Sequence, residues 1–157
     1  MIEMVRSCGS CLVLLLVLVG FGTVIRAAED GPVTRAAKAG DLAGVLDSIA
    51  QGADVHALSG DGSTPLLWAA YHFDVEMAEA LVAAGADVDV PNNYGVTPLL
   101  QASRTGDAQM IQVLLDAGAD ASLAHMEGET PLMAASRTGL NAASAADELL
   151  RPAPRRD

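Results

Sequence analysis

The amino-acid sequence predicts an all-α solenoid of stacked helix-turn-helix units with connecting hairpin loops. The motif Thr-Pro-Leu-Leu, or Thr-Pro-Leu-Met in its last copy, begins at Thr64, Thr97 and Thr130. Gly-Ala-Asp begins at Gly52, Gly85 and Gly118, with the same spacing of 33 residues. The chain is 51% hydrophobic but only 3% aromatic, a composition that suits thin helical layers built from Leu, Val, Ala and Ile. Two unrelated motifs that share one period indicate a repeat architecture.

Each unit is expected to hold two helices. Threonine before proline, as in Thr64-Pro65, caps a helix whose first position tolerates proline. Glycines that provide a left-handed C-cap end the first helices at Gly40, Gly106 and Gly139. The second helix has apolar residues at helical spacing and stops at Gly85 or Gly118.

The register divides residues 28–150 into repeats at about 31–57, 64–90, 97–123 and, in part, 130–150. The first repeat is degenerate, and the last loses register because the expected Leu pair arrives two residues late, at Leu149-Leu150. This last unit is either a polar cap or the edge of a truncated array, and truncation is favoured. Residues 151–157 are expected to be a disordered tail.

The N-terminal segment, residues 1–27, is predicted to be a signal peptide. Arg6 precedes the apolar run Cys11–Val19, and small residues follow, so cleavage after Ala27 is favoured. The alternative is an uncleaved membrane anchor, because Ser7–Ile25 is uncharged over 19 residues. Both cysteines lie in this segment and are interpreted as incidental.

The quoted motifs resemble the ankyrin repeat family, as found in exported bacterial proteins, over about 120 residues of this chain. The sequence departs from that family in three ways. Leu67, Leu100 and Met133 stand where the family has His, so apolar packing is expected between repeats. Phe73 replaces the glycine that ends the first helix, which puts the tightness of that turn in doubt, and Trp68 replaces a buried Leu and is expected in the core.

No active site is recognised, so the chain is predicted not to be an enzyme and to need no cofactor or metal. His56, His72 and His125 fall in different repeats without a second ligand at metal spacing, and no hydrolase or phosphate-binding motif occurs. Nucleic acid is excluded as a partner by the charge, since 18 Asp and Glu face four Lys and Arg between Ala28 and Leu150.

The resemblance implies that the chain binds protein through its hairpin tips and the exposed ends of its first helices. Four of the tip positions are predicted to contact the partner. The tip positions are Gly60, Asp61, Ser63, Asn93, Tyr94, Val96, Met126, Glu127 and Glu129. The predicted partner-binding residues are Tyr71, His72, Asn93, Tyr94, Ser103, Arg104, Met126, Glu127, Ser136 and Arg137. Tyr, Met and Arg are common interface anchors, which favours Tyr71, Tyr94, Arg104, Met126 and Arg137.

The predicted function is therefore that of a secreted or periplasmic module that binds a partner protein and modulates or protects it. The acidity predicts a basic partner, or at least binding that weakens with salt. The alternative is a membrane-tethered scaffold or a truncated fragment of a larger ankyrin repeat protein. Contact with a membrane is expected only if the N-terminal segment is uncleaved.

Overall fold

The computed structural model describes residues 30–138, which form seven α-helices and no β-strand. The helices are α2 (Pro32–Ala39), α3 (Leu42–Ala50), α4 (Pro65–His72), α5 (Val75–Ala83), α6 (Pro98–Thr105), α7 (Ala108–Asp116) and α8 (Pro131–Arg137). The predicted all-α repeat solenoid is confirmed. The predicted signal peptide or anchor, the C-cap at Gly139, the second helix of the last repeat and the tail lie outside the described residues.

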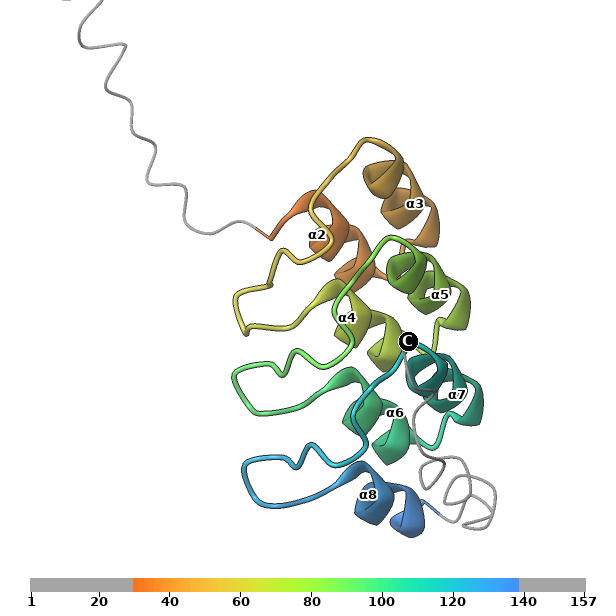
Figure 1. Ribbon diagram of the computed structural model, residues 1–157. Helices are drawn as coiled ribbons and strands as arrows, with labels where there is room; N and C mark the ends of the chain where they lie inside the picture. Colours follow the sequence, from red (N-terminus) through yellow and green to blue (C-terminus); the bar gives the residue numbers. More distant parts are fainter. Residues whose placement is uncertain (1–29, 139–157) are drawn as a thin grey trace, which may run out of the picture.

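The helices form two columns, and the loops between repeats form a third (Figure 1). The first helices of the repeats, α2, α4, α6 and α8, pack on one another in order. The second helices, α3, α5 and α7, stack beside them. The loops all project on the side away from the second helices. None of the helices between residues 30 and 138 is long and apolar enough to cross a membrane.

Side-chain caps fix where each helix begins. The Oγ1 atoms of Thr64, Thr97 and Thr130 accept hydrogen bonds from backbone amides three residues later, at 3.1, 3.2 and 3.3 Å. The predicted starts of these first helices are thereby confirmed. Aspartates cap the second helices in the same manner, a feature not predicted from the sequence, and they are Asp41, Asp74 and Asp107.

The core is continuous along the stack because the two inner repeats, α4–α5 and α6–α7, bury the same positions. Leu66 and Leu99 are fully buried between successive first helices, together with small alanines such as Ala69 and Ala102. From the second helices come Met77, Leu81, Met110, Ile111 and Leu114, all buried. Alanine lets neighbouring helices approach closely, so the repeats share one core in place of several small ones.

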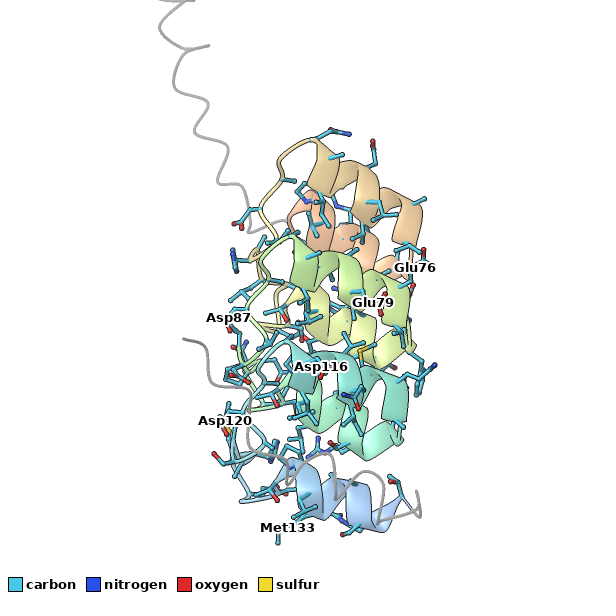
Figure 2. All side chains as sticks on the ribbon, turned by 45° about the vertical axis from the view of Figure 1, so that its right-hand side comes forward. Glu76, Glu79, Asp87, Asp116, Asp120 and Met133 are labelled. Atoms are coloured by element: carbon cyan, nitrogen blue, oxygen red, sulfur yellow. The ribbon has the colours of Figure 1, made fainter. Side chains whose placement is uncertain are left out.

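The expected apolar packing in place of histidine is confirmed at Leu67 and Leu100, which are buried. It is wrong at Met133, whose side chain is 56% exposed and points away from the stack at its lower end (Figure 2). The reason is positional: Leu67 and Leu100 each have a further first helix beyond them, whereas α8 is the last described helix.

The turn at Phe73 is as tight as the turns that end in glycine. Phe73 has φ 61° and ψ 27°, close to Gly40 at 70° and 25° and Gly106 at 79° and 25°. Among the described residues it is the one non-glycine residue with positive φ. A side chain with a Cβ is strained there by about 1–2 kcal/mol, because the Cβ crowds the following carbonyl.

We expect Phe73→Gly to stabilise the protein. Relief of the left-handed strain exceeds the extra entropy that glycine gives the unfolded chain, so the free energy of unfolding should rise by about 0.5–1 kcal/mol. Urea denaturation measures this change. Phe73→Ala is the matched control, since it removes the ring but keeps the Cβ, and it should give no gain. Equal stability of the two variants would contradict a strained turn.

Candidate functional site

The loops between repeats end in hairpin tips of one repeated geometry. The amides of Ser59, Asn92 and His125 donate to carbonyl oxygens four residues later, at 2.9, 3.0 and 2.8 Å. A left-handed glycine sits inside each turn, with φ of 78° at Gly62, 78° at Gly95 and 82° at Gly128. The tips are therefore presented at the same place in every repeat.

Neighbouring tips touch one another. The amide of Asn93 donates to the carbonyl of Asp61 at 3.0 Å, which joins the tips of two successive repeats. A Cβ at Gly62 would lie 2.6 Å from Oδ1 of Asn93, and one at Gly95 would lie 3.0 Å from Cγ of Met126. The tips thus form a continuous surface in which glycine is needed for close approach.

The predicted partner-binding residues are exposed, with one exception. The largest are Tyr71, Tyr94 and Met126, which are 56%, 62% and 77% exposed. The other exposed members are His72, Asn93, Arg104, Glu127, Ser136 and Arg137. We call the surface of tips and exposed ends of the first helices, with the nine residues named here, the binding face.

The prediction of an exposed Ser103 is wrong. Ser103 is fully buried, and its hydroxyl donates to the carbonyl of Leu99 at 2.8 Å. It occupies the register of Ala70, which is also buried, whereas Tyr71, Arg104 and Arg137 share the outward position. Ser63 and Val96, which were expected at the tips, are also buried.

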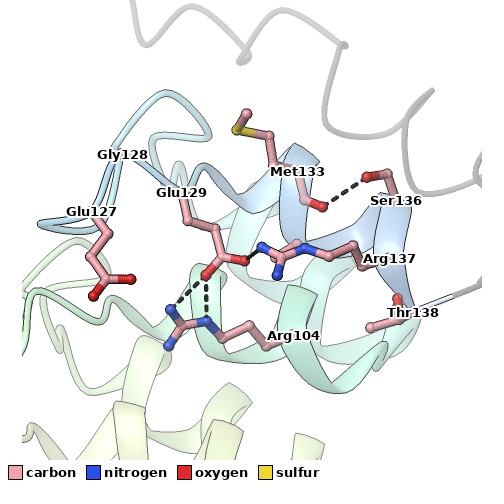
Figure 3. Close-up of a pocket in the computed structure, with 9 residues that line it drawn as sticks. Arg104, Glu127, Gly128, Glu129, Met133, Ser136, Arg137 and Thr138 are labelled. Carbon is pink, nitrogen blue, oxygen red and sulfur yellow. Dashed lines mark hydrogen bonds and ion pairs between the residues drawn. The ribbon is translucent and has the colours of Figure 1, made fainter.

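Glu129 forms ion pairs with two of the arginines that were predicted to bind a partner (Figure 3). Nε of Arg104 donates to Oε2 of Glu129 at 2.8 Å, and Arg137 pairs with Oε1 of the same carboxylate. These three residues, with Met133, line an open hollow between α6, α8 and the last tip. Arg104 and Arg137 are therefore members of one ion-pair network and not free cations.

A second network fixes the carboxylate of Asp61. The hydroxyl of Ser59 donates to Oδ1 at 2.5 Å and that of Ser63 to Oδ2 at 2.8 Å. Partial burial by itself raises the pKa of Asp61, but the hydrogen bonds from Ser59 and Ser63 outweigh it and leave this pKa below its usual value. Asp61 is therefore a fixed negative charge at its tip.

Trp68 joins this network to a group of aromatic side chains. Its indole N–H donates to Oγ of Ser59 at 3.2 Å, and its ring contacts Tyr71 edge-on at 5.7 Å and stacks with His72 at 6.3 Å, measured between centroids. Nζ of Lys38 lies 5.6 Å from the ring centroid. The expected core position of Trp68 is thus correct only in part: the ring packs on the core but is half-buried.

Positive and negative charges are separated between the helix columns. All Lys and Arg within residues 30–138 belong to first helices, at Arg35, Lys38, Arg104 and Arg137. The second helices and the loop segments after them carry carboxylates, including the labelled Glu76, Glu79, Asp87, Asp116 and Asp120 (Figure 2). The column of second helices therefore generates a negative potential, and none of the Lys and Arg within residues 30–138 belongs to it.

Two of these loop aspartates also link successive repeats. Oδ1 of Asp89 accepts from the amide of Asp120 at 2.8 Å. Burial raises the pKa of Asp89 despite this hydrogen bond, and the negative charges of Asp120 and Asp87 add to the rise. The hydroxyl and amide of Ser122 lower the pKa of Asp120.

The histidines lie apart, as their positions in different repeats suggest. Nε2–H of His72 donates to the carbonyl of Lys38 at 3.0 Å, and Nδ1 of His125 accepts from the amide of Glu127 at 3.2 Å. In the part of the chain that the structure describes, no three His, Cys, Asp or Glu side chains gather as they would around a metal ion.

The residues that pair with the predicted partner-binding side chains could not be identified from the sequence. Glu129 is 25 residues from Arg104 and 8 from Arg137, so only the stacking of repeats reveals the network. The Ser59, Asp61 and Ser63 cluster could have been found from its spacing, since such residues form local turns with their own hydroxyl and carboxyl groups.

Comparison with known families supports the repeat assignment. A protein-family model described as ankyrin repeats, in three copies, matches residues 33–125, which is more than half of the chain. The match begins in α2 and ends in the third hairpin. A search of curated proteins found no match.

Proposed function

The chain belongs to the ankyrin repeat family, whose repeats are protein–protein interaction modules, and on that premise we propose that it is exported and binds a partner protein through the binding face. Binding would modulate or protect the partner. Catalysis is not part of the proposal, because this fold is typically an interaction scaffold.

The observation that carries the proposal is the exposure of large side chains on a rigid frame. A partner that docks here would bury more apolar surface at Tyr71, Tyr94 and Met126 than at most surface residues. Hydrogen bonds between tips, such as that from Asn93 to Asp61, hold the frame before binding. Less conformational freedom is then lost when the partner docks.

The charge distribution supports a basic partner. The side of the second helices carries carboxylates and no described Lys or Arg, and three of the four cations of the first helices are already in ion pairs with Asp30 or Glu129. A negative potential of this kind speeds the approach of a cationic protein and is screened by salt.

The binding face is tested by affinity capture from an envelope extract with the tagged full-length chain. Simultaneous Ala substitution of Tyr71, Tyr94, Arg104 and Arg137 should reduce binding of the captured protein more than about tenfold, because such anchors carry most of the energy of an interface. Binding should also weaken between 0.05 and 0.5 M NaCl in the unsubstituted protein, for the screening reason above.

The matched control replaces Gln109 and Gln112 on α7 by Ala, which alters the opposite side without changing its charge. This control should bind as the unsubstituted protein does. If the fourfold variant also retains full affinity while folded, the partner uses another surface and the proposed face is wrong.

Export is proposed from the N-terminal sequence and is tested by mass spectrometry of the mature protein. A chain that starts at Ala28 in the secreted or periplasmic fraction is the expected result, since the apolar run Cys11–Val19 is shorter than a membrane span. An intact Met1 in the membrane fraction would instead establish a tethered scaffold, the alternative that the uncharged stretch Ser7–Ile25 allows.

A further inference from the structure

We propose that the aromatic cluster of Trp68, Tyr71 and His72 on α4 is the subsite that receives an arginine side chain of the partner protein, with Asp61 as its counter-ion. This proposal rests on the proposed protein-binding function and names the chemistry of the partner at one place on the binding face.

The cluster has the geometry of a cation-binding surface. Trp68 and Tyr71 meet edge-on at an interplanar angle of 78°, so their ring faces are turned in different directions, and His72 completes the group with a ring contact to each. Within residues 30–138, every recorded ring-to-ring contact is made inside this cluster. Electron-rich ring faces attract cations, and Trp does so most strongly.

The ammonium group of Lys38 already lies against the ring of Trp68. Its Nζ is 5.6 Å from the centroid of Trp68, within the range of a cation–π interaction, and 3.2 Å from Oδ2 of Asp30. Because Lys38 is neutralised by Asp30, it adds little net repulsion to an arriving cation. An arginine of the partner would compete with this ammonium for the ring.

Arginine is favoured over lysine as the incoming group. A guanidinium is planar, stacks on aromatic faces and is more weakly hydrated than an ammonium, so it loses less when it leaves water. Tyr71, at 56% exposure, offers a ring that can stack with such a plane.

Asp61 supplies the complementary charge. Its carboxylate is bonded to Ser59, and Ser59 also accepts the N–H of Trp68 at 3.2 Å, so the charge and the ring belong to one hydrogen-bonded unit. The serine hydroxyls hold the carboxylate in place before the partner arrives, which lowers the ordering cost of an ion pair with a guanidinium.

The experiment uses the single tryptophan of the chain as the reporter. The purified full-length protein is titrated with a nine-residue Gly/Ser peptide that contains four arginines and has blocked ends. Two peptides of the same length, with lysine or citrulline in place of arginine, are compared. We expect the arginine peptide to change the fluorescence of Trp68 with saturation, the lysine peptide to bind about threefold more weakly, and the neutral citrulline peptide to give no change.

Substituted proteins show whether the arginine peptide binds at the aromatic cluster. Tyr71→Ala and Asp61→Asn should each weaken the arginine peptide about fivefold or more, and Lys38→Met, which removes the competing ammonium, should strengthen it about threefold. The double variant Gln109→Ala and Gln112→Ala on α7 lies outside both the cluster and the binding face and should leave the affinity unchanged. Circular dichroism confirms that each variant is folded.

An unchanged Trp68 signal, equal affinity for the citrulline peptide, or full affinity of both Tyr71→Ala and Asp61→Asn would overturn the arginine subsite. Binding of the arginine and lysine peptides that is insensitive to these variants would assign the effect to the acidic side of the second helices, which also overturns it. None of these outcomes would contradict the capture of a partner protein through the binding face. The proposed function can therefore be correct even if the arginine subsite is not.

Discussion

The packing of each first helix against the next is the interaction on which the rest of the structure depends. A single unit of two short helices has too little interior to bury its own apolar face. Burial of Leu66 and Leu99 beside small residues such as Ala69 and Ala102 joins α2, α4, α6 and α8 into one core. Because α4 and α6 bury the same register, the residues that remain outside recur at fixed positions along the stack.

This regular spacing presents the loops and the exposed ends of the first helices as one continuous surface. Hydrogen bonds from Asn93 to Asp61 and from Asp120 to Asp89 tie loops of successive repeats to one another. The glycines inside the turns permit this close approach, and the threonine caps fix where each first helix starts. Aromatic and ion-paired side chains of the first helices therefore lie on one side of the stack, while carboxylates of the second helices set the potential on the other.

Most of the fold could be predicted from the sequence because it follows from local chemistry. Thr-Pro specifies a helix start, and the shared period of two motifs specifies stacking. Exposure was harder to predict, because it depends on which neighbours surround a position. Ser103 is polar yet buried beside Leu99, and Met133 is apolar yet exposed. The partners of Glu129 come from distant parts of the chain, and the left-handed backbone of Phe73 contradicts the usual preference of that residue type.

Hydrogen exchange at the backbone amides of Asn93 and Asp120 tests most directly whether stacking makes the loops part of a rigid frame. Both residues have exposed side chains, yet their amides donate to the preceding repeat at 3.0 and 2.8 Å. We expect these amides to exchange at least about 100-fold more slowly than in an unfolded chain, and to open together with those of α6. Exchange near the unfolded rate while α6 stays protected would show that the tips move independently of the helical stack, and would contradict a preformed binding face.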